Sequence, residues 1–404
     1  MSHFIFKAKT PTGEMYSGEK EAADRYELYK LLREKGDEVI EFKEKQGSKK
    51  RSERKSFFSG RVKMIEKITF ARNLGSMLQA GLALSRALAV LEQQTKNKTF
   101  KTILLDVIAQ IGRGTTFADA LSKHGKTFPN LFVAMVHAGE QSGTLAESLK
   151  VVANQMESTY NLDRRIKGAL IYPGVIVTAM VLIAILMFIF VIPTLLKTFT
   201  DLNVELPFTT RMVVYVSDLI QNHGLLVLAA LLVIGGMISG FAKQEKGKRF
   251  FHRLFLKIPL IGPLVQEVNT ARTARTLSSL LGSGVDIVES VSITAAVVQN
   301  VHYQEVLSKA ATAIKKGDLM SKIFNEYQDL YPIFFIQMMG VGEETGKTGE
   351  MLLGVAKYYE DDVDQQTKNM STIIEPILIL VIGAAVGFFA ISMIQPMYSL
   401  VNVI

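Results

Sequence analysis

The feature that most constrains this chain is a run of 29 residues between Lys167 and Lys197 that contains no Asp, Glu, Lys or Arg. About 20 apolar residues in a helix cross the roughly 30 Å hydrocarbon core of a bilayer, so this run predicts a membrane span. Residues 219–242 and 376–404 form two further uncharged runs. No apolar run of the signal-peptide kind precedes them, so we expect the N-terminal 160 residues to stay where they are made. The sequence therefore predicts a membrane protein with three spans.

Basic residues beside the spans predict the orientation, because cytoplasmic flanks are enriched in Lys and Arg. Arg164, Arg165 and Lys167 precede the first span, and six bases lie between residues 243 and 257, after the second. The intervening loop, 197–218, carries two bases against three acids. We therefore expect the N-terminus and both large soluble segments to be cytoplasmic, with this loop and the C-terminus external.

Composition excludes several chemistries. The chain contains no Cys, which rules out disulfide frameworks, thiolate metal sites and Cys nucleophiles. Its formal charge of +8 comes from two basic stretches, residues 46–67 and 243–257. These stretches indicate a linker and a span flank that attract anionic lipid. Because they lack interleaved aromatic residues, we do not expect nucleic acid as a partner.

The chain also contains a tandem repeat, because adding 203 to a position in the first half reaches a matching residue in the second without insertions. The first span thereby corresponds to the third, and the second span returns the chain for another copy. Matching pairs include Gly81 and Gly284, Gly114 and Gly317, Pro129 and Pro332, Pro173 and Pro376, and Pro193 and Pro396.

The predicted fold is an all-α polytopic membrane protein with two repeated cytoplasmic helical bundles, three transmembrane helices and a small α+β N-terminal element. Apolar stripes that stop at glycines indicate short helices in each copy. From Ser142 or Thr144 a helical pattern runs on into the first span, and from Thr348 a second one runs into the third span. The N-terminal element is expected to have β-β-α-β order, with its helix over residues 22–35. The expected division is an N-terminal domain 1–45, a basic linker 46–60, helical domain 1 at 61–167, transmembrane helix 1 at 168–196, an external loop 197–218, transmembrane helix 2 at 219–242, a basic cytoplasmic connector 243–263, helical domain 2 at 264–370, transmembrane helix 3 at 371–396 and an external tail 397–404.

Each copy carries a short Gly-Glu motif, GEQSG in the first and GEETG in the second. Its glycines suit a turn that needs positive φ. Its glutamate either joins the two repeats or serves as a capping-box carboxylate, and capping is favoured. The GKT at 346–348 lacks the glycine that a P-loop needs at position 341, which is Val341. The residues of the two Gly-Glu motifs are Gly139, Glu140, Gly143, Gly342, Glu343 and Gly346.

An acidic cluster precedes the third span and consists of Glu360, Asp361, Asp362 and Asp364. Carboxylate oxygens suit Ca²⁺ or Mg²⁺, but a solvated helix face or a contact with a basic partner is the favoured interpretation. The six histidines show no paired ligand spacing, and no catalytic motif occurs. We therefore expect no metal, no cofactor and no enzymatic activity.

The doubled pattern carries a resemblance to a known family. The first copy reads ARNLGSMLQAGLALSRAL and GEQSGTLAESL, and the second reads TARTLSSLLGSGVDIVESV and GEETGKTGEML. Each is followed by Tyr-Pro or Glu-Pro at the head of a span, namely Tyr172-Pro173 and Glu375-Pro376. Over nearly its whole length the chain resembles the type II secretion F and type IV pilus platform family. The second copy departs at Thr348 and Gly349, which replace Leu and Ala, so its last helix is expected to begin differently.

This resemblance implies an inner-membrane scaffold without a catalytic site. Such a scaffold links a cytoplasmic hexameric ATPase to pilin-like subunits, alongside other inner-membrane assembly proteins and copies of itself. Tyr172, Pro173, Glu375 and Pro376 are then candidates for a pilin contact at the membrane boundary, although Glu375 could simply extend toward the headgroups. A transporter or a receptor of unknown ligand remains the alternative, and three spans with few polar residues disfavour it.

Overall fold

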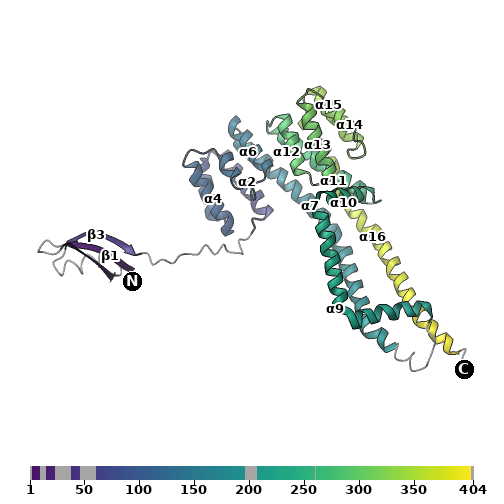
Figure 1. The fold of residues 1–404 in the computed structure, drawn as a ribbon. Helices are drawn as coiled ribbons and strands as arrows, with labels where there is room; N and C mark the ends of the chain where they lie inside the picture. Colours follow the sequence, from purple (N-terminus) through teal and green to yellow (C-terminus); the bar gives the residue numbers. More distant parts are fainter. Residues whose placement is uncertain are drawn as a thin grey trace. The chain divides into compact units, whose positions relative to one another are not determined.

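The computed structural model describes residues 2–9, 15–22, 38–45, 61–195, 207–259 and 261–401. These residues belong to two compact units, 1–61 and 62–404, coloured along the chain in Figure 1. The predicted linker 46–60 and the helix expected over residues 22–35 lie outside the described residues, apart from residue 22.

The N-terminal unit contains a three-stranded antiparallel sheet. Its strands are β1 (Ser2–Lys9), β2 (Met15–Ala22) and β3 (Glu38–Lys45). The strand order is β2-β1-β3, so the first strand lies in the centre and pairs with both others. A register shift between Lys7 and Ala8 marks a bulge in the β1–β3 pairing.

The larger unit confirms the tandem repeat helix by helix. The helices of the first copy are α2 (Met64–Gln79), α3 (Leu84–Gln94), α4 (Lys98–Ile111), α5 (Phe117–Ser122), α6 (Asn130–Ser142) and α7 (Leu145–Leu186). The helices of the second copy are α11 (Ile261–Gly282), α12 (Ile287–Val297), α13 (Val301–Ile314), α14 (Met320–Asn325), α15 (Ile333–Thr345) and α16 (Thr348–Val401). Both ends of α3, α4, α5 and α6 recur at the same 203-residue offset in α12 to α15.

Glycine turns divide each copy at the same places. In the described residues, positive φ occurs at Gly81, Gly114 and Gly143 and at their three counterparts, Gly284, Gly317 and Gly346. Only glycine adopts this backbone region without steric cost, so the helices end where these glycines stand. The predicted role of Gly143 and Gly346 in turns agrees with their φ values of 74° and 70°.

The last helix of the second copy does not begin differently, contrary to expectation. Helix α7 begins at Leu145 and α16 at Thr348, which are equivalent positions. Gly349 of the second copy stands where the first copy has an alanine, and the first copy has its glycine in the partner helix instead. In the first copy Gly75 of α2 lies against the carbonyl of α7 residue 146, whereas in the second Gly349 lies against Leu281 of α11. One glycine per copy thus allows the same two helices to approach closely.

Among the residues that the structure describes, three helices are long and apolar enough to cross a membrane. Helices α7 and α16 each run without a break from a helical bundle into an apolar stretch (Figure 1). A π-helical turn, Met187–Val191, follows α7. The third helix, α9 (Phe208–Lys243), contains non-helical backbone at His223, where it bends.

Helix α9 begins earlier than the predicted second span. Residues 208–218, expected as loop, are helical, because one face of this segment packs on the ends of the other two spans. Thr210, Val213 and Ser217 lie on that face and are buried. The basic connector is likewise helical: α10 (Glu245–Lys257) follows α9 after Gln244, an extended residue.

Each bundle has its own aromatic core. In the first copy Phe70, Phe100, Phe128 and Phe132 have neighbouring ring centroids 5.0–6.1 Å apart. In the second copy the rings belong to Tyr303, Phe324, Tyr331 and Phe335, 4.7–5.3 Å apart. The two cores therefore stabilise two similar bundles, and the helices between them decide how the bundles are joined.

Candidate functional site

The two copies meet where α7 packs against α11 and α16, on the membrane-proximal side of the bundles. We call the polar residues of this contact the coupling interface: Gln155, Asp163, Arg165, Arg272, Thr276, Ser279 and Asp364. Leu162 of α7 packs there with Leu264 and Val268 of α11 and with Val363 of α16. The contact therefore joins both membrane-continuous helices to one another.

Gln155 lies at the centre of the coupling interface and is 2% exposed. Its amide nitrogen donates to Thr276 Oγ1 at 3.2 Å, and its amide oxygen accepts from Ser279 Oγ at 2.9 Å. A buried amide that lost these partners would pay a desolvation cost of about 1–3 kcal/mol. This pairing therefore specifies the register of α7 on α11.

Ion pairs continue the coupling interface toward the membrane. Arg272 of α11 pairs with Asp163 of α7, and Arg272 is only 10% exposed. Arg165 of α7 contacts Asp364 of α16 at 3.3 Å. Lys368, which donates to Asp364, and Arg165 lower the pKa of that carboxyl. The bundle-side flank of the first span is thus bound to that of the third.

A buried carboxyl pair lies beside these ion pairs. Glu267 of α11 is 9% exposed, faces Asp362 of α16 and accepts a hydrogen bond from Gln366. Burial first, and then the charge of Asp362, raise the pKa of Glu267 from 4.5 to about 7. The neighbouring carboxylate thus disfavours ionisation of Glu267.

The predicted acidic cluster does not converge on one point. Glu360 pairs with Arg275, Asp362 faces Glu267, and Asp364 contacts Arg165. Asp361 is exposed. Among the residues that the structure describes, no three His, Cys, Asp or Glu side chains gather as a metal site would require. Helical geometry is the reason, because successive residues on a helix point in different directions.

The Arg275–Glu360 pair has an equivalent in the first copy, Arg72 with Glu157. The oxygen–nitrogen distances are 2.5 Å in both, but the second-copy pair is more buried, with 14% and 19% exposure against 46% and 41%. Arg275 also donates through Nε at 2.7 Å, so its contact is bidentate. Because both partners recur at the repeat offset, the sequence held a signal for this pair.

The motif glutamates cap helices, although not as capping boxes. Glu140 accepts hydrogen bonds from the backbone N–H groups of Phe117 and Ala118 at 2.8 and 3.0 Å. Glu343 does the same for Met320 and Ser321, at 2.6 and 3.1 Å. Each carboxylate therefore caps the short helix that precedes its own, α5 or α14. The sequence motif could not show this, because the capped groups lie more than 20 residues away.

The first glycine of each motif is required for packing. A Cβ on Gly139 would overlap the side chain of Ser148, and one on Gly342 would lie 2.6 Å from the Cα of Thr348. Glycine here lets α6 and α15 lie directly against the start of the long helices α7 and α16. The motif thus fixes where each membrane-continuous helix begins.

The four membrane-boundary residues lie within continuous helices. Pro173 is inside α7 and Pro376 inside α16, and Tyr172, Glu375 and Pro376 are exposed. Their assignment to a pilin contact stays a prediction.

The spans make polar contacts nearer the ends that lie away from the bundles. There Thr210 of α9 donates to the backbone oxygen of Ser392 at 2.6 Å, and Ser217 donates to that of Phe188 at 3.0 Å. The carbonyl of Phe188 lies in the π-helical turn. Helix α9 therefore joins the first and third spans.

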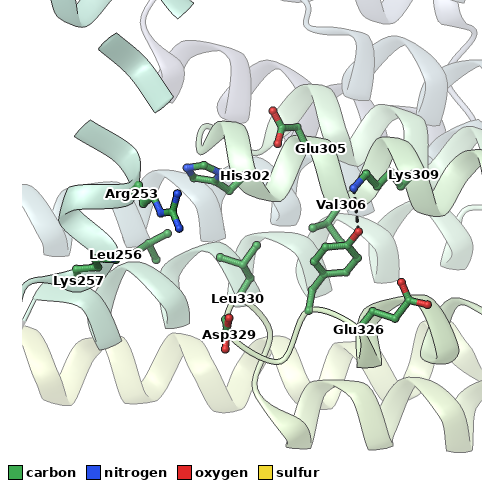
Figure 2. A pocket seen from close by; sticks show the side chains of 11 residues that line it. Arg253, Leu256, Lys257, His302, Glu305, Val306, Lys309, Glu326, Asp329 and Leu330 are labelled. Atoms are coloured by element: carbon green, nitrogen blue, oxygen red, sulfur yellow. Dashed lines mark hydrogen bonds between the residues drawn. The ribbon is translucent and has the colours of Figure 1, made fainter. Parts of the chain in front are cut away.

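A surface hollow of about 540 Å³ lies between α10, α13 and the turn at 326–330, and Figure 2 shows its lining. Arg253, Lys257 and Lys309 face Glu305, Glu326 and Asp329, so the charges nearly balance. Lys309 donates to the Tyr327 hydroxyl at 3.0 Å (Figure 2). A lining of balanced charge favours no ligand of one particular charge.

The sequence did not reveal Gln155, Asp163, Glu267 or Arg272 as important. Their positions in the other copy hold Tyr358, Gln366, Met64 and Thr69. Gln155, Asp163 and Arg272 differ because each joins one copy to the other, and a repeat comparison finds only what the copies share. Glu267 contacts Asp362 and Gln366 within the second copy, and the first copy has no carboxyl at the equivalent position.

Comparison with known proteins agrees with the doubled fold. The family model described as type II secretion system (T2SS), protein F, matches residues 70–193 and again residues 273–396. These two matches differ by the same 203 residues that relate the copies. Together they cover more than half of the chain.

The chain is also similar to known proteins along its full length. The chain is 33% identical to the type IV pilus assembly protein PilC of Thermus thermophilus, over 100% of this chain and 99% of that protein. It is 31% identical to PilC of Myxococcus xanthus, over 100% and 96%. It is 29% identical to the type II secretion system protein F of Pseudomonas aeruginosa, over 99% of each. With its repeat, its three membrane-spanning helices and these matches, the chain belongs to the type II secretion system protein F family.

Proposed function

We propose that the chain is the inner-membrane platform protein of a type IV pilus assembly or type II secretion machine. In this role it couples a cytoplasmic hexameric ATPase to pilin-like subunits that enter or leave the membrane. Its N-terminus lies in the cytoplasm and its C-terminus outside, as the basic flanks favour. The names of its relatives support the machine, and the positions of the three spans support the membrane location.

The observation that carries this proposal is the continuity of α7 and α16. Their 42 and 54 residues correspond to roughly 60 and 80 Å of helix, enough for a bundle contact and a complete bilayer crossing. A helix whose backbone bonds are satisfied internally transmits displacement along its axis without unfolding in lipid. A push or rotation of either bundle would therefore move a span directly.

The coupling interface makes the two long helices act together. Arg165 with Asp364 and Asp163 with Arg272 hold α7 against the second copy close to the membrane. Motion imposed by an ATPase on one bundle then reaches both spans. Of the four predicted acids only Asp361 is exposed, so it is the part of the acidic face that is free to meet such a partner.

The test is a pair of insertions in α7 between Lys167 and Gly168, where the bundle meets the span. Two alanines rotate the span by about 200° relative to the bundle, whereas four rotate it by only about 40°. We expect the two-residue insertion to abolish fibre assembly or secretion, and the four-residue insertion to retain most of it. Both proteins must reach the membrane in equal amounts by immunoblot. Equal activity of the two would contradict rigid coupling.

A second test addresses the function as a whole. Deletion of the gene should abolish pili or secretion, and the purified chain should not hydrolyse ATP. Unchanged assembly after deletion would refute the platform role. Substrate flux through the chain in proteoliposomes would instead favour the transporter alternative. The division into domains at the boundaries given above also stays a prediction.

A further inference from the structure

Helix α10 presents an uncovered apolar face beside the membrane. Phe250, Leu254 and Phe255 are 58%, 41% and 43% exposed. At 100° per residue these three, together with Phe251, fall within an arc of roughly 140° on one side of the helix. A soluble helix that packed only on its own bundle would turn these residues inward.

The opposite side of α10 is the side that packs on the protein. His252 Nδ1 accepts from the Val301 backbone N–H at 3.2 Å, and Leu256 packs on the second core. Arg249 pairs with Glu305 of α13 at 2.5 Å. Around the helix axis, the mean direction of these residues lies roughly 160° from that of the apolar face. The apolar face is therefore directed away from the cytoplasmic bundle.

The position of α10 matches the edge of the hydrocarbon. Twenty residues of α9 lie between its bend at His223 and its end at Lys243, and they correspond to about 30 Å, the thickness of the hydrocarbon core. Helix α10 begins two residues later, after the extended Gln244. A Cβ on Gly247 would overlap the carbonyl oxygen of Phe241, so this glycine permits a tight turn out of α9.

Basic side chains flank the apolar face. All of them are exposed, and in the part of the chain that the structure describes none of them has an acidic ion-pair partner. The set is Lys243, Lys246, Lys248, Arg253 and Lys257. Bases beside an apolar stripe, at the depth of the headgroups, are the pattern that binds anionic lipid surfaces. A protein partner would not require this combination of depth and charge.

We propose that α10 lies in the headgroup layer of an anionic membrane leaflet. Phe250, Leu254 and Phe255 enter the acyl boundary, and the flanking bases contact lipid phosphates. The helix thereby attaches the second bundle to the membrane surface through Arg249 and His252. This inference rests on the proposed location of the connector at the inner surface, and it is independent of the pilus or secretion role.

Fluorescence quenching of the full-length chain in nanodiscs tests the depth. Because the chain lacks Cys, a bimane label can be placed at Phe250→Cys or Leu254→Cys, with Lys316→Cys on the bundle as the control. An apolar face lies about 5–10 Å into the headgroup and acyl boundary. We expect acyl-brominated lipid to quench the labels on α10 about threefold more than the control label. Aqueous iodide should quench the control label more than the labels on α10. Equal iodide quenching at all sites would overturn the proposal. Protection of the α10 labels from both quenchers would also overturn it, because it would show that protein covers the apolar face.

A comparison of anionic with zwitterionic nanodiscs tests the lipid class. Nanodiscs with phosphatidylglycerol should hold the label at residue 254 deeper than discs of zwitterionic lipid. Replacing Lys246, Lys248, Arg253 and Lys257 by Gln should remove this dependence, whereas K315Q/K316Q should leave it intact. Immersion that is the same in both lipids would overturn the anionic assignment. Nanodiscs contain no ATPase or pilin, so failure here is distinct from failure of the platform role.

Discussion

The buried Glu267 predicts a pH dependence of stability with a definite sign. Burial, followed by the neighbouring charge of Asp362, raises its folded-state pKa from 4.5 to about 7. Below pH 4.5 both the folded and the unfolded chain hold the proton, and no penalty arises. Between 4.5 and 7 the unfolded chain loses its proton first, so stability falls as pH rises. Above pH 7 the full penalty is present.

The difference between these pKa values corresponds to about 3 kcal/mol at pH 8, at 1.36 kcal/mol per pKa unit. Glu267→Gln retains the shape of the side chain and offers Asp362 a hydrogen-bond donor, so it should remove the penalty. We expect the melting temperature of the full-length variant to exceed that of the parent by roughly 3–5 °C at pH 8, and to differ little at pH 5. Glu350→Gln, on an exposed part of α16, is the matched control and should change neither.

The assay is thermal denaturation in detergent, followed by size-exclusion chromatography of a fluorescent fusion. Heating of membrane proteins is irreversible, so melting temperatures at one scan rate are compared rather than free energies. A variant that is less stable than the parent at pH 8, or equally stabilised at both pH values, would refute the reasoning. It would show that the Glu267 carboxylate is compensated by contacts other than Asp362 and Gln366.

Three further predictions follow from the fold. Glu343→Gln weakens the acceptor for two backbone N–H groups of α14 and should cost about 1–2 kcal/mol, measured as a melting temperature lowered by several degrees; no change would show that the cap is dispensable. A Cys at Asp201 should react with an impermeant reagent in intact cells and one at Gln299 should not, and the reverse pattern would contradict the orientation. Isolated residues 61–166 and 264–369 should each give helical circular dichroism, whereas mainly β spectra would contradict two autonomous bundles.

Much of the architecture followed from periodicity in the sequence. Long uncharged runs predict spans because a helix must cover a fixed apolar thickness. The 203-residue offset predicts a doubled fold because matching glycines end helices at matching places, and the φ values of Gly81 and Gly284 agree. The start of α9 was missed because residues 208–218 are only partly apolar, and their helix is stabilised by contacts with spans that are distant in sequence.

The candidate site was less accessible from the sequence. The motifs GEQSG and GEETG placed Glu140 and Glu343 in turns, whereas they lie in α6 and α15, and only the fold shows that they cap α5 and α14. Likewise the run from Glu360 to Asp364 looked like a single acidic feature. A helix distributes consecutive side chains around its axis, so these acids reached three different partners.

What the sequence alone determined is therefore the content of each half: helix ends at glycines, apolar runs of membrane length, and a small sheet before them. Tertiary structure decided how the halves are joined. Gln155 and Arg272 act between the copies, and Glu267 acts between two helices of the second copy; the other copy does not repeat any of the three, and no local pattern marks them. Burial gives these polar groups their effect, because an amide or carboxyl removed from water depends on the partner that the fold places beside it.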